Sequence, residues 1–534
     1  MSYLDDAHNF EFKETAFHLG FLPTEQSNPQ TATMEMDFQK STADGIRTLQ
    51  SVDRNVLLMA QKIFASKEFE QLCNAVLSTI KNGNNVVFSG CGATGRLSIL
   101  LEKIWRSGCS RYANQVKSIM TGGDYALVKS VEAFEDHAAF GARQVHDLKM
   151  TSDDLLIAIT EGGETSSVLG TVKEFTRLGG KAFLLFNNPA DILCAHLERS
   201  REAIENPAVT VLDLSCGPMA LAGSTRMQAT TCEQLVASAA LEFAACRLYH
   251  RDQPGNFAEN FACLLDTLES VECVDKMAQQ IDFETEIYRK GGRVTYFADD
   301  YMLDLFTDTT ERSPTFMLPG FHPIDDTRSP EPWAFVRNPL YNAKAALKKA
   351  LGNRELRCLE WTALDYMRMN APQRIIDNPP QITADDLAKI PLGNEYLPSR
   401  YETKADAAVL FYYFAAPAEF EFAVRAEAVN YSKFAKFNGD CGKLPRTMLK
   451  IFEHLAVKLQ WNTISTGTMV RMGRVSGNWM SHVAISNKKL IDRAIRLVSE
   501  LGKVDYHTAC VELFRSIAEP DGTPAVQQTL KRLS

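Results

Sequence analysis

The sequence predicts an α/β fold in which two parallel sheets are flanked by helices and a helical cap closes the chain. Three observations lead to this prediction: a strand–loop–helix unit that recurs, a length of 534 residues, and a final segment with a helical pattern throughout. Parallel neighbours need a crossover helix, so alternating strands and helices indicate sheets covered on both faces. The length exceeds one domain of about 100–150 residues.

The first 65 residues are expected to form an N-terminal arm and a helix. Val52, Val56 and Ile63 follow helical spacing. The segment 22–29 contains two prolines, which keep it out of a helix.

A first domain is expected over residues 66–255. Short apolar runs, each followed by a loop rich in glycine, hydroxyl or amide side chains, predict its strands at 85–89, 116–120, 155–159, 182–186 and 209–212.

A second domain is expected over 256–445. Its predicted strands lie at 293–297, 334–336, 356–359 and 407–413. The loop 298–301 lacks glycine and carries two aspartates that repel phosphate, so this domain is predicted to repeat the fold without the site. Residues 366–400 are rich in Pro, Asn and Asp and predict an irregular surface excursion, and 446–534 form the helical cap.

Composition excludes several classes of protein. With 57 basic and 66 acidic residues the net charge is -9, which argues against a broad nucleic-acid surface. No run of about 18 apolar residues predicts a membrane span, and the acidic, polar start does not resemble a secretion signal. The 12 cysteines form no Cys-x-x-Cys pair, so buried reduced thiols, a cytoplasmic location and no metal or cofactor are expected.

The loop 90–96, Gly-Cys-Gly-Ala-Thr-Gly-Arg, suits an anion. Its glycines allow a ligand to approach the backbone, Thr94 offers a hydroxyl and Arg96 a charge. The same loop matches a dinucleotide fingerprint, but Asp124 lies late for the acidic residue that this alternative requires. The loop 160–167 has the composition of a second wall around one phosphate, although a solvated turn is also consistent with it.

Several motifs together resemble one family. They are Thr-Glu-Gln-Ser-Asn-Pro (24–29), Gly-Cys-Gly-Ala-Thr-Gly-Arg-Leu (90–97), Gly-Gly-Asp (122–124), Val-Glu-Ala-Phe-Glu-Asp (131–136), Leu-Ala-Gly-Ser-Thr-Arg-Met (221–227), and the stretches 462–473 and 485–494. The chain resembles the phosphosugar-binding sugar-isomerase (SIS) family, which contains N-acetylmuramic acid 6-phosphate etherases and glucokinase regulatory proteins. Because roughly 200 residues separate the two conserved parts, the layout is similar to that of the regulatory proteins, with two SIS-type domains and a cap.

The resemblance implies a set of phosphosugar-binding residues. These are Gly92, Ala93, Thr94, Glu135, Thr160, Glu161, Gly162, Lys489 and Arg493. Glu135 corresponds to a carboxylate near the sugar hydroxyls. Lys489 and Arg493 are four residues apart, which places both on one helix face. Ser224 or Thr225 is expected to be a helix N-cap, and Asn28-Pro29 to pin the arm against the domain.

Departures from the etherase pattern favour binding over turnover. Etherases resemble one another in an acid eight positions after the loop arginine, where this chain has Ile104. Gly162 and Glu164 replace a serine and an arginine, which removes a phosphate donor and adds a like charge.

The sequence therefore predicts a monomeric phosphosugar sensor with one site, between the first domain and the cap. Its ligand is expected to be a fructose 6-phosphate-like sugar or an amino-sugar 6-phosphate. A protein partner such as a sugar kinase is implied by the resemblance, and neither nucleic acid nor membrane is expected. Two alternatives stay open: a phosphosugar lyase or isomerase that uses Glu135, and a dinucleotide enzyme.

Overall fold

A computed structural model describes the chain except for residues 1, 132–133, 484 and 486. The first sheet is parallel, in the order β2-β1-β3-β4-β5. Its strands are β1 (Val86–Gly90), β2 (Val116–Met120), β3 (Leu155–Ile159), β4 (Lys181–Phe186) and β5 (Val209–Asp213). Every residue of β1 and β3 is buried, as expected for central strands covered on both faces. All five predicted strands of this domain are confirmed.

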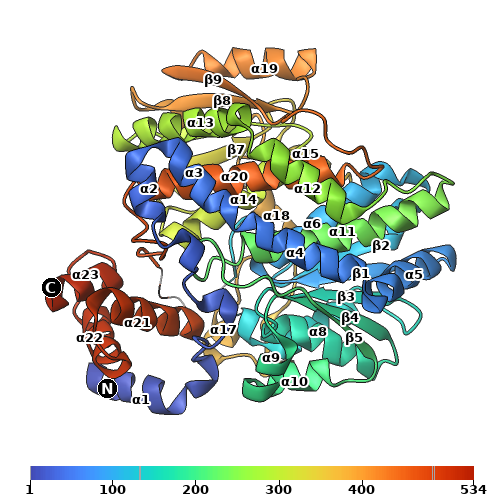
Figure 1. Ribbon diagram of the computed structural model, residues 1–534, viewed down its shortest axis with the longest axis horizontal. Helices are drawn as coiled ribbons and strands as arrows, with labels where there is room; N and C mark the ends of the chain where they lie inside the picture. The colour runs from blue at the N-terminus through green and yellow to red at the C-terminus, as the bar shows by residue number, and fades with distance from the viewer. Residues whose placement is uncertain (1, 132–133, 484, 486) are drawn as a thin grey trace.

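Helices cover both faces of this sheet (Figure 1). They are α5 (Lys67–Lys81), α6 (Gly92–Gly108), α7 (Ala138–Asp147), α8 (Ser166–Arg177), α9 (Ala190–His196), α10 (Glu198–Ile204) and α11 (Gln228–Leu248). Before them stand α1 (Tyr3–Lys13), α2 (Met34–Lys40), α3 (Thr42–Ser51) and α4 (Asp53–Phe64).

The second sheet is also parallel, in the order β7-β6-β8-β9. Its strands are β6 (Val294–Phe297), β7 (Ala334–Arg337), β8 (Ala407–Tyr412) and β9 (Lys433–Asn438). The helices that accompany it are α12 (Phe257–Leu268), α13 (Val271–Arg289), α14 (Met302–Phe316), α15 (Ala343–Ala350) and α19 (Ala418–Ala428).

One predicted strand is wrong. Residues 356–359 form no strand, and the fourth strand is β9. Instead the segment crosses onto the first domain, where the Arg357 carbonyl accepts from the Asp124 N–H (3.0 Å) and the Arg357 N–H donates to the Asp124 carboxylate (2.6 Å). These two hydrogen bonds satisfy the backbone carbonyl and N–H groups of Arg357, which a neighbouring strand would otherwise have paired.

The irregular surface excursion predicted for residues 366–400 is not a surface loop in the structure. It contains α16 (Ala363–Arg368), α17 (Gln373–Asp377) and α18 (Ala384–Ala388). Tyr366 and Ile375 are buried in an aromatic cluster with Phe134 and Phe140 of the first domain. Part of the second domain therefore supports the turn that carries Glu135.

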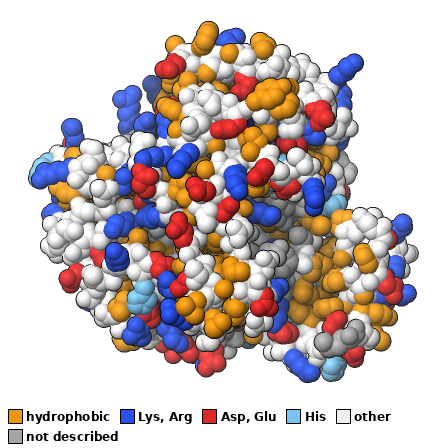
Figure 2. Space-filling model, turned by 180° about the vertical axis from the view of Figure 1, so that it is seen from behind, with side chains coloured by type: hydrophobic (Ala, Val, Ile, Leu, Met, Phe, Trp, Pro, Cys, Tyr) orange, Lys and Arg blue, Asp and Glu red, His pale blue; other side chains and the backbone are white. Residues whose placement is uncertain are grey.

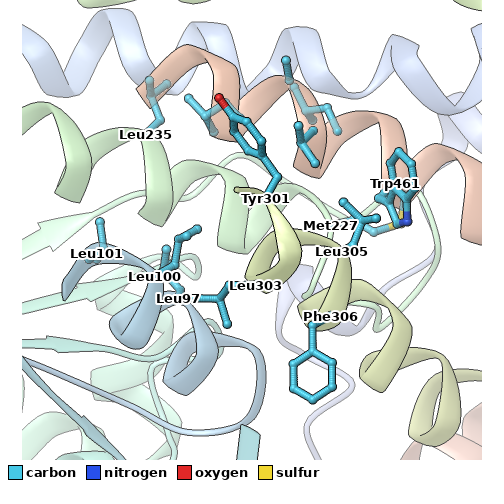
Figure 3. Packing of buried hydrophobic residues seen from close by; sticks show 14 of the residues in the cluster. Leu97, Leu100, Leu101, Met227, Leu235, Tyr301, Leu303, Leu305, Phe306 and Trp461 are labelled. Carbon is cyan, nitrogen blue, oxygen red and sulfur yellow. The ribbon is translucent and has the colours of Figure 1, made fainter. Parts of the chain in front are cut away.

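The two domains share one hydrophobic core. A single cluster of buried residues includes Phe88 of the first sheet and Tyr296 of the second. Figure 3 shows Leu303 of α14 pointing towards Leu97 and Leu100 of α6. Buried ion pairs cross the same boundary, including Arg226–Asp308 at 2.9 Å.

The C-terminal helices fall into two parts. Helix α20 (Ile451–Arg471) is buried along nearly its whole length and belongs to the central core. Helices α21 (Lys488–Gly502), α22 (Tyr506–Ala518) and α23 (Ala525–Leu533) form a separate apolar cluster, which also contains Ala7 and Phe10 of α1. Both chain ends lie in this cluster (Figure 1), which stands as a lobe beside the main body (Figure 2). We call α1 with α21–α23 the cap.

The N-terminal arm joins the cap to the first domain. The Asn28 amide donates to the Pro218 carbonyl (2.7 Å), and the Asn28 carbonyl accepts from the Asn478 amide (2.8 Å). The predicted pinning role of Asn28 is confirmed. Among the described residues, no helix combines the length and apolarity that crossing a membrane requires.

Candidate functional site

A pocket of about 240 Å³ opens where the carboxyl ends of β1 and β3 meet the cap. This is the edge at which parallel α/β sheets bind ligands. Its described lining comes from the start of α6, the segment from the end of β2 to Glu135, the loop after β3, residues 223–226, and residues 480–493, which include the start of α21. Helix α14 of the second domain closes one side. The volume far exceeds the ~10–15 Å³ that a single water needs.

The start of α6 offers backbone donors. Gly92 and Ala93 line the pocket, and N–H groups in the first turn of a helix lack an intrahelical acceptor and carry its positive dipole end. A side chain at Gly90 would put its Cβ 2.4 Å from the Thr94 backbone, so only glycine permits this turn. The Thr94 hydroxyl is engaged behind the wall, where it accepts from the Cys91 N–H (2.9 Å) and donates to the Cys91 carbonyl (2.9 Å).

The loop after β3 contributes Glu161 and Thr165. Thr160 and Gly162 lie behind them: the Thr160 hydroxyl donates to the Thr165 hydroxyl (3.0 Å), and the Gly162 carbonyl accepts from the Asn188 amide (3.1 Å). Burial and the charge of Glu311, against the opposing charge of Lys489, raise the pKa of Glu161 to about 7.

Lys489 and Arg493 both line the pocket from α21, so their predicted common face is confirmed. Arg493 is engaged with Glu25, to which its guanidinium donates at 2.9 and 2.6 Å. Although burial opposes it, Arg493 together with Arg496 lowers the pKa of Glu25 to about 2. Lys489 lies 3.9 Å from Glu164, and the charge of Glu135 raises the pKa of Lys489 against the effect of burial.

Glu135 lies on the short turn 134–136, opposite α21. It accepts a 2.7 Å hydrogen bond from the amide of Asn487. Lys489 lowers the pKa of Glu135, but burial and the charges of Asp136 and Glu164 outweigh it and leave the pKa raised. Within the motifs quoted for the family, residues 132, 133 and 486 lie outside the described residues.

Two parts of the wall were not predicted from the sequence. Ser224 and Thr225 were expected to cap a helix, but α11 begins at Gln228 after Met227, and both residues line the pocket. The Ser224 hydroxyl is buried without a hydrogen-bond partner among the described residues. Their place after β5, at the same sheet edge as the other loops, is the signal that could have identified them.

The other unpredicted residue is Glu311 of α14. It forms an ion pair with Arg96, which also donates to the carbonyls of Leu127 (3.0 Å) and Ala126 (3.1 Å). Arg96 was expected to add charge to the phosphate loop, and this expectation is wrong because Arg96 turns away from it towards the second domain.

Ile104 lies outside this pocket. It is buried in α6 and lines a different recess, with Asp299, Asp300 and Lys450. Twelve residues separate Ile104 from the start of α6, a distance of about 18 Å along a helix. The inference from the missing acid at Ile104 therefore does not apply to the chemistry beside Glu135.

The fold and the pocket define an α/β protein with a polar pocket at the carboxyl edge of a parallel sheet. Residues 68–176 match the model of the glucokinase regulatory protein N-terminal SIS domain. The N-acetylmuramic acid 6-phosphate etherase of Yersinia pestis is 30% identical over 218 residues, 41% of this chain and 68% of the relative. Etherase 1 of Bacillus licheniformis is 29% identical over 219 residues, 41% of this chain and 67% of the relative.

The chain belongs to the SIS-domain family of phosphosugar-binding proteins that contains the etherases and the glucokinase regulatory proteins. Among solved structures it is similar to the tagatose-6-phosphate ketose/aldose isomerase of Escherichia coli, with a TM-score of 0.44 at 9% identity over 82% of this chain and 94% of that one.

Proposed function

We propose that this protein is a cytoplasmic sensor that binds a sugar 6-phosphate in the pocket between the first domain and the cap. The observation that carries the proposal is the convergence of the α6 N-terminus and Lys489 on one cavity, because both attract a phosphate. Family membership supports the same ligand class. All twelve cysteines are free thiols, which suits a reducing compartment.

Calorimetry with hexose and amino-sugar 6-phosphates tests this proposal. Lys489→Ala is expected to weaken binding about ten- to a hundredfold, since hydrogen bonds to charged groups contribute roughly 1.5–3 kcal/mol. The loss for the unphosphorylated sugar is expected to be much smaller. Lys488→Ala is the matched control, because Lys488 is half-exposed and pairs with Glu14 (2.6 Å) instead of lining the pocket.

An equal loss for both ligands, or no loss with Lys489→Ala, contradicts contact between the cap and the phosphate. Failure of every sugar phosphate to bind the native chain contradicts the proposal as a whole.

The proposed role of binding is regulation of a protein partner such as a sugar kinase. Support comes from the pocket itself, since a ligand that touches both α21 and the first domain stabilises one cap position, and a partner can distinguish such states. Protease resistance of the cap with and without ligand tests the coupling. Equal cleavage in both samples contradicts it.

A second candidate is a phosphosugar lyase or isomerase that uses Glu135. It is favoured by one observation, that Glu135 and Glu161 face the same pocket and both have a raised pKa. Two carboxyl groups tuned in this way can share proton abstraction and donation. Two assays test this candidate: exchange of the sugar C2 proton in deuterated water, and lactate release from N-acetylmuramic acid 6-phosphate. Either activity, if it is lost in Glu135→Gln, establishes this candidate over binding alone.

A further inference from the structure

The pocket contains an unbalanced set of charges. Six charged side chains of the described residues line it: Glu135, Glu161, Glu311, Arg226, Lys489 and Arg493. Three of them are ion-paired with groups behind the wall: Arg226 with Asp308 (2.9 Å), Arg493 with Glu25 (2.6 Å), and Glu311 with Arg96. Two carboxylates and one ammonium remain, so a sugar phosphate dianion would enter a pocket that already carries excess negative charge when both carboxyls are ionised.

The remaining ammonium cannot neutralise both carboxylates. Lys489 lies 3.9 Å from Glu164, and its charge acts on both Glu135 and Glu161. One ammonium is therefore shared among several carboxyl groups, and among the described residues no cation serves Glu161 alone.

Glu161 lies in a part of the pocket that is lined by hydroxyl and carboxyl side chains. Thr225 lines the same pocket, and the charges that act on the Glu161 carboxyl group include the acids Glu311 of α14 and Glu233 of α11 and, against them, the base Lys489 of α21. Beside Thr225, the hydroxyl of Ser224 is buried and has no partner among the described residues. A buried carboxylate favours a ligand that supplies a donor, and the Ser224 hydroxyl is able to accept from the same donor.

We propose that the pocket selects a zwitterionic ligand, a hexose 6-phosphate with a free amino group, whose ammonium pairs with Glu161 while its phosphate meets the α6 N-terminus and Lys489. The inference rests on the proposed function and adds to it the class of sugar. An ammonium supplies the missing positive charge and forms charge-assisted hydrogen bonds to the carboxylate and to Ser224. A hydroxyl or an N-acetyl group at the same carbon lacks that charge.

Calorimetry at pH 7.5 with glucosamine 6-phosphate, N-acetylglucosamine 6-phosphate and glucose 6-phosphate tests the selection. Glucosamine 6-phosphate is expected to bind about ten- to a hundredfold more tightly than the other two, the range given by one charged hydrogen bond. Glu161→Gln is expected to reduce this preference to about threefold or less while binding of glucose 6-phosphate persists.

Glu202→Gln is the matched control. It makes the same change of charge, but Glu202 lies on α10, pairs with Lys173 (3.2 Å) and does not line the pocket, so the preference for the amino sugar is retained. A wild-type chain that binds glucose 6-phosphate as tightly as glucosamine 6-phosphate overturns the inference. So does a Glu161→Gln variant that keeps the preference.

A measurement on the native chain covers the case in which Glu161→Gln does not fold. The preference is expected to shrink between pH 7.5 and pH 6, because Glu161, with a pKa of about 7, then takes up a proton. A constant preference across this range overturns the inference. If none of the three sugar phosphates binds, the proposed function fails instead.

Discussion

Glu161 is held near its ionisation point by burial and by the charge of Glu311, with Lys489 acting in the opposite direction. An anion placed in the same pocket raises the pKa of a carboxyl group further. With a sugar phosphate that has no amino group, such as fructose 6-phosphate, binding near pH 7 is therefore expected to make the Glu161 carboxyl take up about half a proton per site, since a group with a pKa near 7 is half protonated there.

Calorimetry of fructose 6-phosphate binding in two buffers of different ionisation enthalpy measures this uptake. In Glu161→Gln the uptake is expected to vanish, while Glu202→Gln, at an exposed residue outside the pocket, retains it. Proton release on binding, or an uptake that is unchanged in Glu161→Gln, contradicts the role given to this carboxyl group.

Sequence reasoning identified some residues of the wall and missed others for physical reasons. The spacing of Lys489 and Arg493 fixes a common helix face, so their convergence on the pocket could be predicted. Glu311 could not, because it reaches the pocket through packing of α14 against the first domain, which no local pattern encodes. Hydroxyl groups such as that of Ser224 suit both helix caps and ligand sites, so residue type alone does not decide between them.

Among the secondary structure elements, the central strands gave the clearest signal, and the edge strand β9 was missed although the edge strands β2, β5 and β7 were predicted. Strands β1 and β3 are fully buried apolar runs, which give a strong signal. Strand β9 is exposed at alternate residues and contains Lys433 and Lys436, a composition that suits an edge strand but resembles a surface loop in sequence.

The attachment of the cap depends on Glu25, which pairs with Arg493 and Arg496 of α21. Its folded pKa of about 2 lies below the ordinary value of 4.5. The ionised carboxyl group therefore stabilises the docked cap fully above about pH 4.5, and that contribution is lost as the pH falls towards 2. At 1.36 kcal/mol per unit the effect is about 3 kcal/mol.

Cleavage of α21–α23 by an acid protease, compared between variants at equal pH, measures this attachment. Wild type is expected to resist at pH 5 and become sensitive towards pH 3, whereas Glu25→Gln is already sensitive at pH 5. Glu14→Gln, which removes a surface ion pair with Lys488, should behave like wild type. Resistance of Glu25→Gln at pH 5 would show that apolar packing alone holds the cap.

The turn that carries Glu135 depends on the excursion from the second domain. Phe134 packs near Trp361 and Tyr366, with ring centroids 6.1 Å apart in both cases. Tyr366→Ala leaves a cavity behind this turn and is expected to weaken sugar-phosphate binding about tenfold or more, although Tyr366 does not line the pocket. Tyr396→Ala, at a residue 79% exposed, is the matched control, and equal affinities in the two variants contradict the supporting role.

At the scale of the whole molecule, the second domain covers an apolar face of the first domain, as a second subunit could do. Helices α14 and α20 pack against α6 and α11 within one continuous core, and Glu311 of α14 completes the ligand pocket. Because this interface is satisfied within one chain, its apolar surface is not available to recruit another copy.

Light scattering is accordingly expected to give a monomer of 59.5 kDa at all concentrations tested. Titration with a sugar phosphate is expected to give one site per chain. The recess beside β6 is expected not to bind phosphate, because the carboxylate of Asp299 there pairs with Lys349 and accepts from the Asn338 amide at 2.7 Å. Exposed apolar side chains that could still support self-association include Phe422 and Val429, which are 75% and 79% exposed on or next to α19. A dimer that Phe422→Ser dissociates would assign that surface to self-association and contradict the prediction of a monomer. Two equal sites in the titration would show that the second domain has kept a ligand pocket of its own.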